Sequence, residues 1–323
     1  MDGKVLIFAY LLLVLGMNDA ATTVKHSHIR GNDKSKERTE DGSYSPRDAH
    51  HHEDGEHHSE FDHEAILGSV KEAEEYDQLS PDESKRRLAK LVVKMDLNQD
   101  QFIDRHELKA WILRSFKKLS EEEASERFEE LDENADGKVT WDEYVRDVFD
   151  MEPGKEDSLP VEQKLMWDDD REMFFTADLN KDGVLNSEEF VLFQSPEEHP
   201  EMLPLILQQT LRSKDTNKDG VIDFQEFIGG EAQDHDKEWL LVEKDKFDND
   251  YDKNKDGYLA GNEILSWMVP SNEEVASDEV DHLFAAADDN HDDRLSYQEI
   301  IDHYDTFVGS EATDYGDQLH DEL

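Results

Sequence analysis

One acidic pattern recurs six times between residues 96 and 299 of this chain. Each copy has Asp at position 1, Asn at 3, Asp at 5, a large aliphatic residue at 8 and Glu at 12. We number the copies loops 1 to 6 in chain order: Asp96–Glu107, Asp132–Glu143, Asp178–Glu189, Asp215–Glu226, Asp252–Glu263 and Asp288–Glu299. One match could arise by chance in so acidic a chain, but six at similar spacing indicate a structural repeat.

These oxygen-bearing positions are those of the EF-hand loop, which wraps one Ca²⁺ between two helices. The Glu at position 12 can bind through both carboxylate oxygens, and position 7 contributes a backbone carbonyl, so its side chain is free to vary. We therefore predict up to six bound Ca²⁺ ions. The predicted ligands at positions 1, 3, 5, 7 and 12 are Asp96, Asn98, Asp100, Phe102, Glu107; Asp132, Asn134, Asp136, Lys138, Glu143; Asp178, Asn180, Asp182, Val184, Glu189; Asp215, Asn217, Asp219, Val221, Glu226; Asp252, Asn254, Asp256, Tyr258, Glu263; and Asp288, Asn290, Asp292, Arg294, Glu299.

Position 6 divides the loops into two groups. The chain turns there with positive φ, which glycine adopts without steric cost. Loop 1 has Gln101 and loop 6 has Asp293, whereas the other loops have Gly137, Gly183, Gly220 and Gly257. A Gln in this conformation costs roughly 1 kcal/mol, and Asp tolerates it better. We expect sites 1 and 6 to be weakened but intact, with a degenerate loop kept only for its shape as the alternative.

Position 9 often reaches calcium through a water molecule. In loop 5 it is Ala260, which removes one hydrogen bond to that water without abolishing the site. Loops 1 and 4 instead carry a fourth acidic side chain there, Asp104 and Asp223. Because loop 4 also has its glycine, we expect site 4 to be the strongest.

Apolar residues at helical spacing flank the loops. Ser80 followed by Pro81 predicts a helix start, and Ser120 followed by three Glu residues predicts another. The first helix has an apolar face of Leu88, Leu91, Val92 and Met95, and the helix before loop 6 has one of Val280, Leu283, Phe284 and Ala287. The fold class expected is all-α.

The position-8 residues predict how the hands associate. They are all apolar and suited to short antiparallel bridges between paired loops: Ile103, Val139, Leu185, Ile222, Leu259 and Leu295. We expect three paired EF-hand units that join loops 1 with 2, 3 with 4 and 5 with 6. Their predicted ranges are 79–151, 160–230 and 236–309. Pro153, Gly154 and Pro160 suit a linker between the first two units.

Composition excludes several classes of partner and of chemistry. The chain has 34 Lys and Arg against 83 Asp and Glu, a net charge of −49. Nucleic acids and anionic membrane surfaces require local positive charge, so neither is an expected partner. The chain has no cysteine, which rules out disulfides, thiol catalysis and thiolate metal sites.

The two ends predict an address in the secretory pathway. Lys4 precedes an apolar run, Val5–Gly16, that is followed by Ala20 and Ala21. A run of that length spans about 18 Å, short of the ~30 Å hydrocarbon core, so residues 1–20 are predicted to be a removed signal peptide, leaving no transmembrane anchor in the mature chain. The tail 310–323 ends in His320, Asp321, Glu322 and Leu323, a signal read by a luminal retrieval receptor. We therefore expect residence in the endoplasmic reticulum lumen.

Residues 21–78 are polar and are predicted to be disordered. They contain a group of histidines: His50, His51, His52, His57, His58 and His63. The group could be a zinc or copper site, or a solvated linker whose charge changes near neutral pH. The segment offers no rigid scaffold for tetrahedral metal geometry, which favours the linker.

The combination of a leader, an acidic and His-rich segment, six cysteine-free EF-hands and a terminal HDEL resembles the reticulocalbin–calumenin family. The segment Phe61–Gly68 is similar to the part of that family that precedes the first hand. The resemblance covers nearly the whole chain, and the HDEL end favours the reticulocalbin branch. It implies low-affinity calcium binding in the secretory pathway and calcium-dependent contacts with client proteins.

Two functions are compatible with these features. One is a calcium buffer of low affinity and high capacity. The other is a calcium-regulated, chaperone-like adaptor that mainly binds secretory-pathway clients. Aromatic residues on the helices after the loops could supply a calcium-dependent surface, with burial in the core as the alternative: Trp111, Tyr144, Trp267 and Phe307. An enzyme is not supported, because the well-placed acidic residues are accounted for as metal ligands.

Overall fold

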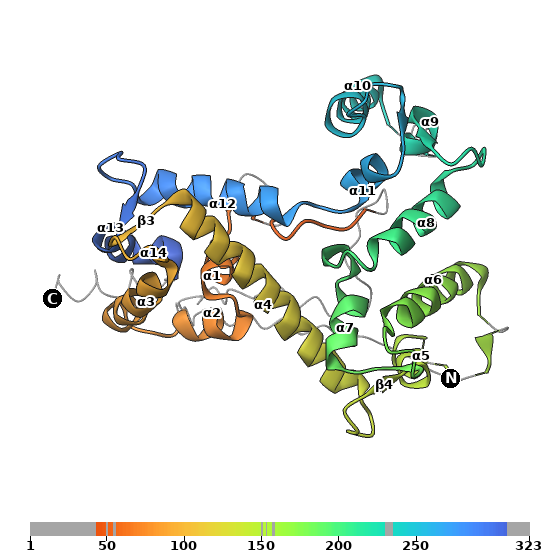
Figure 1. The fold of residues 1–323 in the computed structure, drawn as a ribbon, viewed down its shortest axis with the longest axis horizontal. Coiled ribbons are helices and arrows are strands. Elements are labelled where there is room, and N and C mark those ends of the chain that lie inside the picture. Colours follow the sequence, from red (N-terminus) through yellow and green to blue (C-terminus); the bar gives the residue numbers. More distant parts are fainter. Residues whose placement is uncertain are drawn as a thin grey trace, which may run out of the picture.

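A computed structural model describes residues 43–308, apart from positions 50, 54–55, 150, 153, 157–158 and 230–234. The predicted signal peptide and the HDEL tail lie outside the described residues. Helices dominate the described chain, and its strands are two-residue pieces that join loops in pairs (Figure 1). The expected all-α class with paired EF-hand units is confirmed. No described helix is both long enough and apolar enough to cross a membrane.

The first lobe joins the first and last hands, and we call it lobe 1/6. Its ladder pairs β3 (Phe102–Ile103) with β8 (Leu295–Ser296), placing Ile103 opposite Leu295. Its helices are α1 (Glu60–Leu67), α2 (Val70–Tyr76), α3 (Pro81–Met95), the first half of α4 (Arg105–Leu131), α12 (Asn272–Ala287), α13 (Tyr297–Asp302) and α14 (Tyr304–Phe307). The predicted apolar faces of α3 and α12 meet in one core.

The second lobe, lobe 2/3, has an aromatic core. Its ladder pairs β4 (Val139–Thr140) with β5 (Val184–Leu185). Its helices are the second half of α4, α5 (Trp141–Phe149), α6 (Val161–Ala177) and α7 (Ser187–Gln194), followed by the short 3₁₀ helix η2 (Pro196–Glu198). The rings of Phe174 and Phe190 are fully buried, and both pack against Phe193.

The third lobe, lobe 4/5, pairs β6 (Ile222–Asp223) with β7 (Tyr258–Leu259). Its helices are α8 (Leu203–Lys214), α9 (Phe224–Ile228), α10 (Lys237–Asp245), the π-helical segment η4 (Lys246–Tyr251) and α11 (Asn262–Met268). Phe247 of η4 is fully buried and meets Phe227, which also packs on Trp267. The helix that enters loop 5 therefore ends in a π-helical segment.

The expected pairing of loop 1 with 2, 3 with 4 and 5 with 6 is wrong. Helix α4 is continuous over 27 residues, about 40 Å, and holds loops 1 and 2 at opposite ends. Ser120, predicted to start a new helix, lies buried inside α4, where its Oγ is 3.2 Å from the carbonyl oxygen of Phe116. The predicted boundaries near 151–160 and 230–236 therefore separate consecutive hands in the sequence but not the lobes of the fold.

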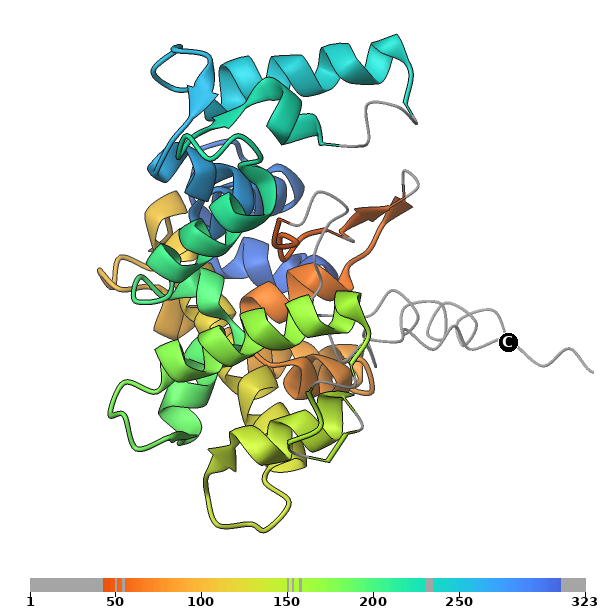
Figure 2. The same cartoon turned by 90° about the vertical axis from the view of Figure 1, so that its right-hand side faces the viewer.

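The three lobes form the corners of a closed triangle. In Figure 1, α4 runs from lobe 1/6 to lobe 2/3, α7 and α8 continue to lobe 4/5, and α12 returns to lobe 1/6. Lobes 4/5 and 2/3 lie at opposite ends of the molecule (Figure 2). Because loop 6 pairs with loop 1, the array of hands closes on itself.

The prediction of disorder for residues 21–78 is wrong for the described part from residue 43. Tyr44 is buried in lobe 4/5, and its backbone N–H donates to the carbonyl of Met268 at 2.9 Å. A small hairpin follows, β1 (His52–Glu53) with β2 (Glu56–His57). Ala65 and Ile66 of α1 are fully buried in lobe 1/6. The few apolar residues of the described part of this segment pack into the cores of lobes 1/6 and 4/5.

The aromatic residues considered for a calcium-dependent surface belong to the packed interior. Tyr144, Trp267 and Phe307 are buried in lobes 2/3, 4/5 and 1/6 respectively. Trp111 is half-buried, and its indole N–H donates to the carbonyl of Ile66 at 2.7 Å. In the described conformation these side chains stabilise the lobes.

Candidate metal centres

The Asp at position 1 organises each loop from the end of the preceding helix. In loop 1, Asp96 Oδ1 accepts from the backbone N–H of Gln99 at 2.6 Å, and Oδ2 accepts from that of Gln101 at 2.9 Å. The position-6 N–H donates to the same carboxylate in the other loops, for example from Gly183 to Asp178 at 2.8 Å. These bonds wrap the backbone around the position-1 carboxylate.

The Glu at position 12 stands in the first turn of the helix after each loop. In loop 4, Glu226 accepts from the backbone N–H of Asn217 at 3.1 Å and of Asp223 at 3.1 Å. Burial alone would raise the pKa of Glu226, but these hydrogen bonds outweigh burial and lower it. The side chain is therefore held ionised, as a calcium ligand must be.

The residues present fit a hard dication. Charged side chains are seldom buried unless they are paired or bind a metal. The carboxylates at positions 1 and 12 are nevertheless buried in several loops, namely in Asp96, Asp178, Asp252, Glu107, Glu143, Glu189 and Glu226. With the neighbouring Asn and Asp oxygens, each loop offers the clustered oxygen set that Ca²⁺ prefers. When bound, the ion would neutralise these carboxylates and order the loop.

The structure places all the predicted ligand residues in their loops and brings the loops together in pairs. Whether each of them binds calcium stays a prediction. At position 3, Asn Oδ1 accepts from the position-5 N–H in loops 1, 3, 4 and 5, for example Asn254 from Asp256 at 2.8 Å. In loops 2 and 6 the Asn Nδ2 instead donates to the position-12 Glu, at 3.0 and 2.9 Å. The position-7 residues lie at or beside the ladders that join the loops.

Backbone strain at position 6 follows the sequence prediction. Gln101 has φ of 71° and Asp293 has φ of 61°, in the left-handed region that favours glycine. Sequence reasoning missed position 4, which is also left-handed in every loop and is never glycine: Gln99, Ala135, Lys181, Lys218, Lys255 and His291. The two loops that lack glycine at position 6 are also the two that pair in lobe 1/6.

Position 9 has a second task that sequence reasoning missed. Asp104 accepts from the N–H of Glu107 at 2.9 Å, and Glu107 accepts in return from the N–H of Asp104 at 3.1 Å. This reciprocal capping box recurs in loops 2, 3, 4 and 6. Ala260 has no side chain that can cap, and α11 begins later, after Gly261. Loop 5 therefore keeps Glu263 at position 12 but lacks the position-9 side chain that caps the helix in the other loops.

Paired loops contact each other's ligand side chains. The Tyr297 hydroxyl, from α13 after loop 6, donates to Asp96 Oδ2 of loop 1 at 2.6 Å. This bond lowers the pKa of Asp96 and raises that of Tyr297 to about 12. In lobe 2/3, Lys138 Nζ of loop 2 donates to Asp182 Oδ2 of loop 3 at 3.2 Å. In lobes 1/6 and 2/3 the two loops are thus joined by side chains as well as by the ladder.

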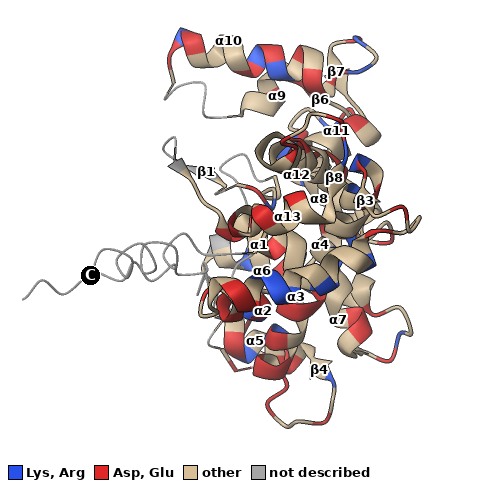
Figure 3. Cartoon of the chain, turned by 90° about the vertical axis from the view of Figure 1, so that its left-hand side faces the viewer, with Lys and Arg blue, Asp and Glu red and all other residues tan. Residues whose placement is uncertain are grey.

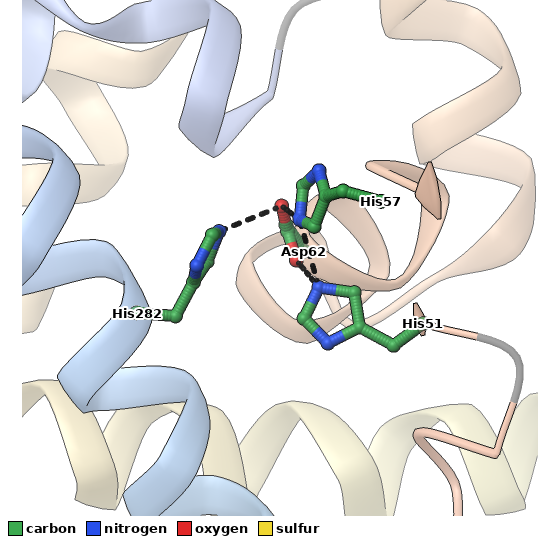
Figure 4. Close-up of side chains that lie close together, drawn as sticks. All are labelled: His51, His57, Asp62 and His282. Carbon is green, nitrogen blue, oxygen red and sulfur yellow. Dashed lines mark hydrogen bonds and ion pairs between the residues drawn. The ribbon is translucent and has the colours of Figure 1, made fainter. Parts of the chain in front are cut away.

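A different cluster lies between the N-terminal hairpin and α12 (Figure 4). Asp62 is fully buried in the first turn of α1, and three imidazoles surround it. His51 Nε2 is 2.7 Å from Asp62 Oδ1, and His57 Nε2 is 3.1 Å from Oδ2. His282 Nε2 of α12 is 3.5 Å from Oδ2. The sequence pointed to the histidines of the hairpin, but nothing local in it joined them to Asp62 or His282.

A second buried acid lies beside Asp62 of this cluster. Burial would raise the pKa of Asp62, but hydrogen bonds from His282 and His51 lower it to about 2. Glu279, one helical turn before His282, is also buried; burial and the charge of Asp62 raise its pKa to about 9. His63 differs from the other histidines, because it is buried against the carbonyl of Asp305 at 3.0 Å and burial lowers its pKa.

Comparisons with known proteins agree with the loop chemistry. The family described as EF-hand domain pair matches residues 85–148, 168–230 and 244–304, which are consecutive hands in the sequence. Reticulocalbin-2 of Rattus norvegicus is 40% identical over 282 residues, covering 84% of this chain and 88% of the relative. Reticulocalbin-2 of Crotalus adamanteus is 39% identical over 83% of this chain and 90% of the relative. Reticulocalbin-3 of Rattus norvegicus is 34% identical over 84% of this chain and 87% of the relative.

Proposed function

Because the chain belongs to the reticulocalbin family of EF-hand calcium-binding proteins, which are not enzymes, we propose that it binds several calcium ions at low affinity and buffers calcium in the endoplasmic reticulum lumen. The observation that supports the proposal is that all six loops carry the predicted ligand residues and are joined in pairs by short ladders. EF-hand modules outside the cytosol bind calcium at roughly 10⁻⁴–10⁻³ M, which suits a calcium-rich compartment.

The distribution of negative charge supports a high capacity for calcium. Acidic residues are spread over all three lobes (Figure 3). Six bound dications would offset about a quarter of the net charge of −49 and reduce its self-repulsion. We expect calcium to raise helicity and compact the chain.

Isothermal titration with calcium, together with far-ultraviolet circular dichroism, tests this proposal. We expect several ions per chain at submillimolar to millimolar calcium and a rise in helical signal. A chain in which all six position-12 Glu are changed to Gln is the matched control, because it keeps the size and shape of each side chain. Binding of one calcium ion or fewer per chain, with no change in the helical signal, would reject the proposal that the protein is a calcium buffer.

The proposed compartment rests on the two ends of the chain, which lie outside the described residues. The terminal HDEL would be bound by a retrieval receptor of the lumen. Deleting His320–Leu323 should therefore release the protein into the medium with calcium binding unchanged, since the last predicted ligand is Glu299. Scrambling the same four residues is the control for length. Full intracellular retention of the deleted chain would show that another interaction holds it.

A second function, a calcium-regulated client adaptor, has its own support. Large apolar residues are exposed along α6 and in loop 3: Leu165 by 63%, Phe175 by 44% and Leu179 by 55%. Arg171 lies over the rings of Trp167 and Phe175, beside a pocket of about 230 Å³. Exposed apolar side chains on a helix that leads into a calcium loop suit a partner surface.

Proximity labelling in the lumen, with and without calcium depletion, distinguishes the adaptor from the buffer. An adaptor loses or gains partners when calcium is removed, and Leu165→Ser changes the same set. Val93→Ser, at another exposed apolar position, is the control. Labelled partners that are identical under both calcium conditions would reject calcium-regulated client binding.

A further inference from the structure

The cluster of His51, His57, Asp62 and His282 has the geometry of a metal site. Their donor atoms all lie within 4.8 Å of one another. A tetrahedral zinc ion with ligand bonds of about 2.0–2.1 Å needs donor atoms about 3.3–3.4 Å apart. The contacts of 2.7, 3.1 and 3.5 Å to Asp62, and 2.9 Å between His51 Nε2 and His57 Nε2, bracket that separation.

The protonation of the cluster also favours a cation at its centre. The Nε2 atoms of His51 and His57 face each other at 2.9 Å while both approach the Asp62 carboxylate. Only one of two facing ring nitrogens can carry the proton between them, so the other turns a lone pair inward. A metal ion uses the lone pairs of all the imidazoles and the negative charge of the buried Asp62 together.

The ligand types select the metal. Three imidazoles and one carboxylate suit zinc and its neighbours among the divalent transition metals, whereas Ca²⁺ takes six or more oxygens. We propose that His51, His57, Asp62 and His282 form a zinc site separate from the six calcium loops. With four protein ligands the site is closed, which is the pattern of structural rather than catalytic zinc.

The surroundings supply access and support. The side chains of His57 and His282 are 36% and 31% exposed, so an ion can enter from solvent. His51 and Asp62 are buried, and the packing around them holds these two proposed ligands in place. Buried Glu279 lies beside Asp62, where a neighbouring carboxyl group can orient a metal ligand.

The site would join segments that are distant in the sequence. His51 and His57 belong to the N-terminal hairpin, Asp62 begins α1, and His282 lies on the helix that enters loop 6. Zinc would therefore fasten the N-terminal segment to lobe 1/6. The chain has no cysteine, so zinc would supply the kind of cross-link that disulfides give other luminal proteins.

Zinc titration of the full chain against a chromophoric zinc chelator, at saturating calcium, tests the site. Saturating calcium keeps the EF-hand loops occupied, so that zinc binding reports other sites. We expect one tight zinc ion per chain, and a loss of affinity of at least about tenfold in His282→Ala. His58→Ala, in the same hairpin but outside the cluster, should bind zinc as the parent chain does. Calcium titrations of both variants report whether the fold is intact.

Cobalt substitution gives a second readout that does not depend on affinity. Co²⁺ in the parent chain should show the intense visible absorption of tetrahedral coordination, and His282→Ala should lose it. Three results would overturn the proposal. They are no zinc bound at micromolar concentration, an equal loss in His58→Ala and His282→Ala, and the weak spectrum of octahedral cobalt in the parent chain.

Discussion

Single residues set the quality of each calcium loop through backbone conformation. Gln101 occupies the left-handed position that Gly220 occupies in loop 4, with φ of 71° and 86°. A Cβ added at Gly220 would meet no atom within 4 Å, so only the backbone conformation favours glycine there. The two positions therefore form a matched pair for measuring that preference.

We expect Gln101→Gly to strengthen site 1 and the reverse change, Gly220→Gln, to weaken site 4. Each should change the binding free energy by about 1 kcal/mol, or about fivefold in affinity, because the same positive φ is relieved in one variant and imposed in the other. Competitive chelator titrations measure both. Shifts of the same sign in the two variants would contradict backbone strain as the cause.

Local residue patterns were sufficient to predict the loops but not the histidine cluster. Each calcium loop takes its predicted ligands from one short stretch, so their types and spacing can be read directly. The cluster needs Asp62 and His282, which lie on different helices, and no periodicity links them. Position 9 was read only as a water-mediated ligand, although the Asp or Ser found there also fits the helix-capping pattern.

At the scale of elements, the pairing of the hands could not be predicted from the sequence. All six position-8 residues are aliphatic, so each could bridge any other, and chain proximity favoured neighbours. The outcome depends on α4, whose continuity through Ser120 keeps loops 1 and 2 apart. A Ser followed by Glu residues has the same composition at a helix start and in the middle of a helix, and here Ser120 is buried and its hydroxyl donates to Glu198.

Engineered disulfides test the pairing directly, since the chain has no cysteine of its own. Phe102 lies opposite Ser296 in the ladder of lobe 1/6, within reach of a disulfide. The double variant Phe102→Cys with Ser296→Cys should form an intramolecular bond with calcium present. Phe102→Cys with Thr140→Cys, which pairing of loops 1 and 2 would favour, should stay reduced. Non-reducing electrophoresis separates the two results, and the opposite pattern would contradict the ladder.

At the scale of the whole molecule, Glu198 joins parts from around the triangle. Its carboxylate accepts from Arg47 at 2.8 Å, from Ser120 of α4 at 2.6 Å and from Asn272 of α12 at 3.0 Å. Burial would raise the pKa of Glu198, but the charge of Arg47 and these hydrogen bonds outweigh it and lower the pKa. The ionised form is therefore stabilised in the folded protein.

A group whose pKa is lowered by folding stabilises the protein above its unfolded pKa, and that contribution is lost as the pH falls through the folded value. We expect Glu198→Gln to lower the free energy of unfolding by about 1–3 kcal/mol at pH 7. The difference should shrink as the pH falls below about 4.5. Urea unfolding at fixed calcium measures it, with the exposed Glu121→Gln as the control. A difference that is constant from pH 7 to pH 4 would contradict the role of the charge.

The closure of loop 6 onto loop 1 also has a consequence for biosynthesis. Arg105, near the end of loop 1, binds Asp293 of loop 6, which follows 188 residues later in the chain. At about 5–20 residues per second, a ribosome needs roughly 10–40 s to make that stretch. During this interval the first hand has no partner, and the apolar face of α3 has only part of its core. We therefore expect the newborn chain to expose part of the apolar core of lobe 1/6 until its last hand emerges.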